Sequence, residues 1–424
     1  MRNVELLMPA GNLEKLKYAV IYGADAVYLG TADFSLRAMR KGEIITPANL
    51  KRAVDLAHEL GAKAYLTLNI FAFNSDIKHL EKTMDIIRDS KPDAVLVSDF
   101  GILRLLKKYM PDVQLHISTQ TNILNYECVK FWQDLGAKRV VLARELSIPE
   151  VAEIKRQVPD IEIECFVHGS QCVSFSGRCL LSDYLTQGGR KANSGSCSQP
   201  CRWSYKLVEE TRPGQYYEIN QNERGSHILS PKDLCLVKYL RELIDAGVDS
   251  FKVEGRTKSL YYVSAVAKTY RQAIDDVLNN PASDMEKYFT ELKKVGNRGY
   301  TTGFALGGNK PDSYSYDISK GLAGADFLFE FHGKKEYCEV NFISDRHDNL
   351  YFVKVKNKIL RNDEVEIITP NEQFSTKISE ILDEKGESID AANTNSEVYL
   401  KFDHEPVRYD VALARTIGVK EHVY

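Results

Sequence analysis

The sequence has no long apolar run, and no stretch approaches the roughly 18 residues that a helix needs to cross a bilayer. Its first residues, MRNVELLMPAGNLEKL, contain neither the apolar core nor the small-residue cleavage site of a secretory signal. We therefore expect a cytoplasmic protein with no membrane partner. The 424 residues carry a formal net charge of only −3, so binding to nucleic acid would require a local basic patch.

Signatures of several enzyme classes are also missing. The HELGA segment at 58–62 lacks the second histidine of a zinc-protease helix, and the DFG segment at 99–101 stands without the other protein-kinase elements. The chain has no GxSxG motif and no glycine fingerprint for dinucleotides. These absences argue against a zincin protease, a protein kinase, an α/β-hydrolase and a dinucleotide-dependent enzyme.

Short apolar segments alternate with amphipathic helical stretches over residues 1–260. Eight such units predict an α/β protein with a (β/α)8-type barrel, and an open doubly wound sheet is the alternative. The strand candidates are residues 4–8, 26–30, 64–70, 94–98, 114–118, 139–143, 161–167 and 250–254.

The gap between the last two strand candidates is much longer than one helical connection needs. It predicts a cysteine-bearing insertion at about residues 169–249, on the C-terminal face where barrel active sites lie. We expect the barrel domain to span 1–310. Short strands separated by Asp, Asn and Gly turns then predict a small C-terminal β-barrel-like domain over 320–424.

Alternation along the strands places several polar side chains inside the barrel. Glu164 and His168 on the seventh strand are candidates for acid–base catalysis. Lys252 and Arg256, at the eighth strand, suit an anionic ligand. For any one residue the alternative is an internal salt bridge, such as Glu164 with Lys252 or Arg256. The set as a whole predicts a pocket, whose other substrate-binding candidates are Glu254, His116, Gln120 and Asn69.

Five of the eight cysteines fall within the predicted insertion: Cys172, Cys179, Cys197, Cys201 and Cys235. Thiolates gathered by a Gly- and Ser-containing loop are typical of a zinc site or an iron–sulfur cluster. The chain has no CxxC pair, which favours a [4Fe–4S] cluster over zinc, and reduced free thiols are the remaining alternative. The cysteines elsewhere, Cys128, Cys165 and Cys338, are expected to be inert.

The segment ECFVHGSQCVSFSGRCLLS at 164–182 resembles the signature of the collagenase-like peptidase family of unknown catalytic type. Gln171 departs from an aliphatic position of that signature. Further segments that resemble the family are ELLMPAGNLEKLKYAVIYGADAVYLG, HISTQTNILN, GSCSQPCRW and FKVEGRTKS. The positions that match the signature are Glu164, Phe166, Gly169, Ser170, Cys172, Gly177, Cys179, Leu181 and Ser182.

This resemblance implies a choice between two chemistries. Some family members are named as proteases or collagenases, whereas others take part in oxygen-independent hydroxylation of tRNA, ribosomal RNA or ubiquinone precursors and carry a [4Fe–4S] cluster. The chain is most similar to the tRNA branch, which implies formation of 5-hydroxyuridine at the wobble position, with tRNA as partner and prephenate as a small anionic co-substrate. The implied cluster ligands are Cys172, Cys179, Cys197 and Cys235, with Cys201 as a neighbour.

Two other functions stay open from the residues. One is a collagenase-like peptidase, and the other is a non-catalytic iron–sulfur partner protein. The tRNA hypothesis requires a local basic surface, for which the insertion offers candidates together with Trp203 as a stacking surface. These candidates are Arg178, Arg190, Lys191, Arg202 and Lys206.

Overall fold

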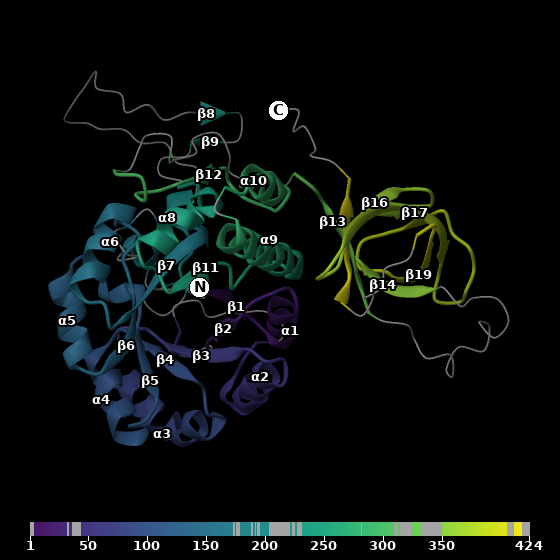
Figure 1. Ribbon diagram of the computed structural model, residues 1–424. Coiled ribbons are helices and arrows are strands. Elements are labelled where there is room, and N and C mark those ends of the chain that lie inside the picture. Colours follow the sequence, from purple (N-terminus) through teal and green to yellow (C-terminus); the bar gives the residue numbers. More distant parts are fainter. Residues whose placement is uncertain are drawn as a thin grey trace.

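The computed structural model in Figure 1 describes most of the chain. The described residues are 4–31, 34–35, 44–172, 174, 179–187, 190, 192, 196–202, 221–222, 225–226, 231–280, 282–308, 313, 324–332, 350–404 and 411–417.

The predicted (β/α)8 barrel is confirmed. Seven parallel strands follow one another around the barrel, and β11 (Ser250–Val253) closes it by pairing with both β1 and β7. The seven are β1 (Glu5–Pro9), β2 (Ala26–Leu29), β3 (Lys63–Leu68), β4 (Ala94–Val97), β5 (Gln114–Ile117), β6 (Ala137–Val141) and β7 (Glu162–Gly169).

Helices cover the outside of the barrel (Figure 1). They are α1 (Leu13–Ile21), α2 (Pro47–Glu59), α3 (Asn74–Ser90), α4 (Phe100–Tyr109), α5 (Tyr126–Asp134), α6 (Ile148–Gln157), α8 (Leu240–Asp245) and α9 (Leu260–Asn279). Their starts follow the sequence: Ser147 and Glu150 form a capping box at α6, and Pro47 stands in the first turn of α2. Among the described residues, none of the helices combines the length and apolar character of a membrane span.

The insertion begins after β7, and its last strand pairs with β7 again. Its described elements are α7 (Leu181–Leu185), the 3-10 turns Pro200–Arg202 and Val237–Tyr239, and the short strands β8 (Gln221–Asn222), β9 (Gly225–Ser226) and β10 (Asp233–Cys235). β10 runs antiparallel to β7, with Cys235 opposite His168. β12 (Tyr300–Thr301) extends the sheet beyond β10, and α10 (Glu286–Lys293) precedes β12. The insertion is thereby anchored at the C-terminal end of β7.

The C-terminal part is a closed antiparallel barrel, as expected for a small β-barrel-like domain. Its strand order is β13-β14-β19-β17-β16-β20, and its interior is a separate apolar core. The strands are β13 (Phe327–Phe331), β14 (Tyr351–Val355), β16 (Glu364–Ile368), β17 (Gln373–Leu382), β19 (Glu397–Phe402) and β20 (Leu413–Thr416), and β15 (Ile359–Leu360) pairs with β18 (Ala391–Ala392) outside the barrel.

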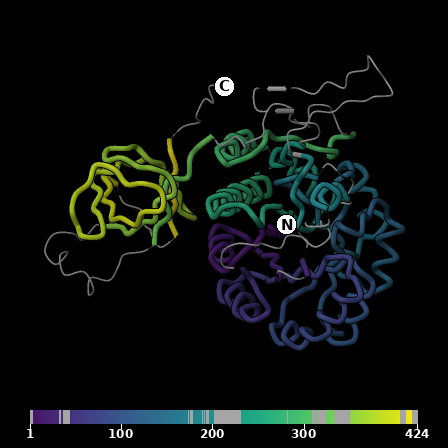
Figure 2. The backbone as a smooth tube through the Cα atoms, turned by 180° about the vertical axis from the view of Figure 1, so that it is seen from behind, coloured from purple at the N-terminus to yellow at the C-terminus, as the bar shows by residue number. Residues whose placement is uncertain are grey.

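The two barrels meet beside α9 (Figure 2). The fully buried Arg415 on β20 forms ion pairs with Glu291 at 2.5 Å and Glu366 at 2.6 Å, and it donates to the hydroxyl of Tyr261 at 2.9 Å. The hydroxyl of Tyr22 lies 2.9 and 2.7 Å from two carbonyl oxygens of the C-terminal domain. Because a buried guanidinium needs such partners, Arg415 ties the domains together.

Replacing Arg415 with Ala should therefore lower the free energy of unfolding by about 3 kcal/mol, since Glu291 and Glu366 lose their shortest ion pairs and keep only Lys294 as a cation among the described residues. Arg241 provides a matched control, because its pair with Asp245 is exposed on α8, and Arg241→Ala should change stability by less than about 0.5 kcal/mol. Urea unfolding followed by circular dichroism measures both. Equal unfolding midpoints for the two variants would contradict the role assigned to Arg415.

Candidate active site at the barrel mouth

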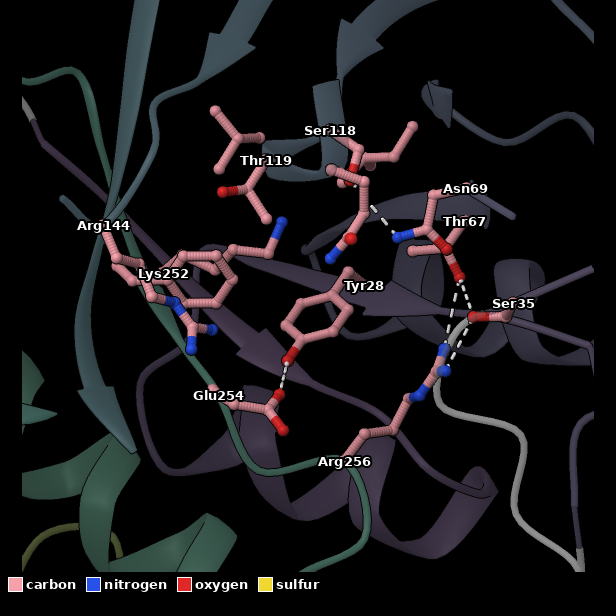
Figure 3. A pocket seen from close by; sticks show the side chains of 14 residues that line it. Tyr28, Ser35, Thr67, Asn69, Ser118, Thr119, Arg144, Lys252, Glu254 and Arg256 are labelled. Atoms are coloured by element: carbon pink, nitrogen blue, oxygen red, sulfur yellow. Dashed lines mark hydrogen bonds between the residues drawn. The ribbon is translucent and has the colours of Figure 1, made fainter. Parts of the chain in front are cut away.

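A polar pocket lies at the C-terminal ends of the barrel strands (Figure 3). The pocket is partly open to solvent at the barrel mouth. Among the described residues, three basic side chains and one acidic side chain line it. The lining residues are Tyr28, Ser35, Thr67, Asn69, Leu96, Ser118, Thr119, Gln120, Val141, Arg144, Phe166, Lys252, Glu254 and Arg256. Five of the residues singled out from the sequence are thus brought together: Asn69, Gln120, Lys252, Glu254 and Arg256.

Arg256 is held in a tight polar cradle. Its guanidinium donates to the hydroxyls of Ser35 at 2.6 Å and Thr67 at 3.2 Å, and these two hydroxyls are 2.7 Å apart. A Cβ atom at Gly30 would collide with all three side chains. The absence of a side chain at Gly30 therefore allows the end of β2 to pack against the fixed guanidinium.

Aromatic rings surround the other charges of the pocket. The amine of Lys252 lies 4.7 Å from the ring centre of Tyr28 and 5.5 Å from that of Phe166. The guanidinium of Arg144 stacks at 3.9 Å on the same Phe166 ring and donates to the carbonyl of Ser170. The Tyr28 hydroxyl is 3.2 Å from Glu254. Lys252 and Arg144 thus share one wall of the pocket.

Glu164 lies beneath this pocket and does not line it. Its carboxylate is fully buried, 2.6 Å from the amine of Lys252 and 3.1 Å from Arg139. Arg139 also pairs with Glu5 at 2.5 Å and Glu162 at 2.7 Å. The salt bridge between Glu164 and Lys252, the alternative left open by the sequence, is therefore present.

His116 lies deeper in the barrel and is also outside the pocket lining. Its ring packs edge-on against Tyr65, with centres 4.8 Å apart. Burial, together with the positive charges of Arg139 and Lys252, holds the pKa of His116 well below its ordinary value. His116 is thus a neutral side chain of the barrel interior. It does not line the pocket, where a substrate-binding residue was expected.

The prediction that His168 faces the barrel interior is wrong. The pairing of β7 with β11 is in step at Phe166 and Lys252 but next pairs His168 with Val253, so Val167 is an extra residue in β7. This bulge shifts the alternation by one residue. His168 consequently faces α9, among the rings of Tyr262, Tyr270 and Tyr300. Burial and the charge of Lys258 lower the pKa of His168 to about 3, which keeps the imidazole neutral.

The cysteines of the insertion have the chemistry of iron–sulfur ligands, but they do not converge in this conformation. The sulfurs of Cys179 and Cys197 each accept a backbone N–H at 3.3 Å, as cluster thiolates commonly do. Ser182 and Ser198 join their two segments. Cys172 is exposed, whereas Cys235 is buried 3.9 Å from the Tyr270 hydroxyl, and burial raises the pKa of Cys235 to about 12. Among the described residues, no group of three potential ligands forms a metal site.

Only part of the predicted basic surface falls within the described residues. The guanidinium of Arg190 donates to the carbonyls of Ser196 and Cys197, so it supports the cysteine-bearing segment. The side chains of Arg178, Lys191, Arg202, Trp203 and Lys206 lie outside the described residues, as does Cys338.

Comparison with known proteins identifies the family. The model of the family described as "Peptidase family U32" matches residues 11–314, and that of its C-terminal domain matches residues 338–413. The chain belongs to peptidase family U32. The expected family membership is thus confirmed, and the pocket, the bulged β7 and the first cysteines of the insertion all fall within the matched region.

Relatives in this family carry different names. The tRNA hydroxylation protein P of Haemophilus influenzae is 38% identical, over 92% of this chain and 90% of that protein. The Escherichia coli synthase of 5-hydroxycytidine in 23S rRNA is 36% identical, over 75% of this chain and 47% of that protein. A protein named collagenase from Porphyromonas gingivalis is 32% identical, over 72% of this chain and 74% of that protein.

Several site residues of this U32 chain were not identified from the sequence. Tyr28 and Arg139 lie on β2 and β6, where the alternation applied to other strands would have placed both inside the barrel. Arg144 and Ser35 follow the ends of their strands, in loops whose course has no periodic signal. Strand alternation therefore finds the interior residues, whereas loop residues need the structure.

The buried charges beneath the pocket should make the free energy of unfolding depend on pH. Burial alone would raise the pKa of Glu5, but Arg139, Tyr65 and Ser250 outweigh it and hold that pKa below the ordinary 4.5. Ionised Glu5 therefore stabilises the fold above the unfolded-state pKa, and this contribution is lost as the pH falls through the lower folded-state pKa. Glu5→Gln should cost about 2 kcal/mol at neutral pH and make the remaining stability less sensitive to acid.

Urea unfolding between neutral pH and about pH 3.5 measures this effect. Glu59, whose ion pair with Arg52 is exposed, is the matched control, and Glu59→Gln should keep the acid dependence of the original chain. An unchanged acid dependence in Glu5→Gln would show that the buried network does not respond to pH as described.

Proposed function

We propose that this protein hydroxylates the wobble uridine of tRNA to 5-hydroxyuridine without molecular oxygen, using prephenate as co-substrate and a [4Fe–4S] cluster. The observation that carries the proposal is the cationic pocket at the barrel mouth, joined directly to the cysteine-bearing insertion. The names of the relatives support RNA hydroxylation as the reaction class.

The charges of the pocket favour a small molecule with more than one carboxylate. In the described part of the chain, Arg144, Lys252 and Arg256 line it together with one acidic residue, Glu254. Guanidinium groups bind carboxylates through paired hydrogen bonds. Prephenate carries two carboxylates. Arg144 and Arg256 would bind them, and the rings of Tyr28 and Phe166 would pack against its carbon ring.

One contact connects the pocket to the insertion. Arg144 lines the pocket and donates at 2.9 Å to the carbonyl of Ser170, two residues before Cys172. The thiolates of Cys172, Cys179, Cys197 and Cys235 would hold the cluster. This assignment is supported by the preference of iron–sulfur clusters for cysteine thiolates. When bound, such a cluster would supply one-electron transfer. The hydrogen bond between Arg144 and Ser170 would fix the position of the insertion relative to the co-substrate.

The peptidase alternative has less support in the described residues. No histidine is among the described residues that line the pocket. His168 packs among tyrosines on the other side of β7. The Cys165 thiol is half-buried, and desolvation raises its pKa. Neither His168 nor Cys165 therefore belongs to a pair of nucleophile and base that can reach a peptide, as a His- or Cys-dependent peptidase needs.

The direct test of the function is mass spectrometry of tRNA nucleosides from a strain that lacks this protein. Loss of 5-hydroxyuridine and its derivatives, and recovery with the full chain, is the expected result. Arg256→Lys should recover at least about tenfold less product, because a point charge replaces the fixed guanidinium fork, whereas the surface variant Arg241→Lys should recover all of it. Unchanged tRNA nucleosides, together with gelatin cleavage by the pure protein, would favour the peptidase alternative.

The proposed cluster has its own test. Protein purified without oxygen should be brown and contain about four irons per chain. Replacing Cys172, Cys179, Cys197 or Cys235 with Ser should each remove most of the iron and the visible absorbance. The same replacement of Cys128, which is exposed on α5, should leave both unchanged. Stoichiometric zinc without iron would contradict the cluster.

A further inference from the structure

Lys252 occupies an unusual position between the pocket and a buried carboxylate. It belongs to β11, is only 4% exposed, and still lines the pocket. Its amine lies 2.6 Å from an oxygen of Glu164, within direct proton-transfer distance. Charge pairing of two buried groups accounts for so short a contact, and the same contact also lets a proton pass between Lys252 and Glu164.

The carboxylate beside Lys252 is itself held by a third group. The second oxygen of Glu164 accepts a hydrogen bond from Arg139 at 3.1 Å, and Arg139 is fixed in turn by Glu5 and Glu162. A nucleophile, a base within hydrogen-bonding distance and a group that orients the base form the arrangement by which enzymes activate weak nucleophiles. Lys252, Glu164 and Arg139 have these three positions.

The surroundings of the amine act on its proton in opposite directions. The rings of Tyr28 and Phe166 lie within cation–π distance of the amine, and such rings attract its charged form. Desolvation lowers the pKa of Lys252 below its ordinary value, although the charge of Glu164 opposes this shift. Desolvated lysines in apolar pockets are the ones that form Schiff bases with carbonyl compounds.

The neighbouring cation indicates which carbonyl compound would fit. Arg144 and Lys252 both contact the ring of Phe166, and Figure 3 shows Arg256 on the far side of Tyr28 from Lys252. A carboxylate bound to Arg144 would bring a ketone on the adjacent carbon towards the amine. This arrangement suits a 2-oxo acid, and Arg256 could bind a second carboxylate of the same molecule.

We propose that Lys252 is a catalytic residue that forms a Schiff base with the ketone of a 2-oxo acid bound in the barrel pocket. The inference rests on the proposed function and deepens it, because prephenate carries a 2-oxo acid side chain. Formation of the imine would fix the co-substrate covalently while the rest of the molecule faces the mouth.

The step balances without an oxidant or reductant. Glu164 accepts a proton from the ammonium of Lys252, and the free amine forms a bond to the ketone carbon. The C=O π bond breaks, and the ketone oxygen takes up a proton from the attacking nitrogen. Glu164 then returns its proton to the departing hydroxyl, the C–O bond breaks, and one water leaves. The product is a protonated imine, and hydrolysis by the reverse route frees the lysine.

Borohydride trapping tests this step on the full chain with its cluster in place. Incubation with pyruvate or prephenate followed by sodium borohydride should give a reduced adduct, which peptide mass spectrometry should locate at Lys252. Lactate has the carboxylate but no ketone and should give none. Lys252→Arg should lower the adduct at least about tenfold, and Glu164→Gln should slow its formation. Mapping the adduct on the original chain needs no variant to fold.

Lys268 is the matched control lysine. It is also largely buried, and burial lowers its pKa to about 8, but it binds two backbone carbonyls of the C-terminal domain, far from the pocket lining. Lys268→Arg should keep the adduct. Absence of an adduct, or an adduct on another lysine, overturns the inference. If prephenate binds and tRNA is hydroxylated without any adduct, the inference fails while the proposed function stands.

Discussion

Four ionised side chains of alternating sign fill the inside of the barrel: Glu5, Arg139, Glu164 and Lys252. Such charges are costly to bury, and removal of any one leaves its partner without compensation. The series therefore fixes each member in place. Its last member, Lys252, forms part of the pocket, so the demand for charge pairing in the barrel interior also determines the geometry of the candidate active site.

Two other parts of the protein are built onto this barrel through β7 and α9. The insertion leaves β7 and returns as β10 beside it, while Arg144 bonds Ser170 at the same end of the strand. The C-terminal barrel packs against the outer side of α9 and α10 through Arg415. Tyr262 and Tyr270 on the inner side of α9 surround His168. β7 thus connects the pocket, the cysteines and the domain interface.

The sequence predicts the repeated features better than the local ones. Eight apolar segments that alternate with helical stretches were sufficient for the barrel, and strand alternation was sufficient to place Lys252 and Glu164 inside it. The same rule failed for His168 because a single extra residue at Val167 reverses the alternation, and a bulge leaves no mark in the residue pattern. Arg144 and Ser35 were missed because their loops have no period, so only packing determines where these side chains point.

The central claim is that the cationic pocket of the barrel is the co-substrate site. It is tested most directly by the electron density of the full chain crystallised without oxygen in the presence of prephenate. The account predicts density for prephenate in the pocket, with its carboxylates at Arg144 and Arg256 and its ketone carbon beside the amine of Lys252. Prephenate bound outside the barrel mouth, with the pocket side chains unchanged, would contradict it.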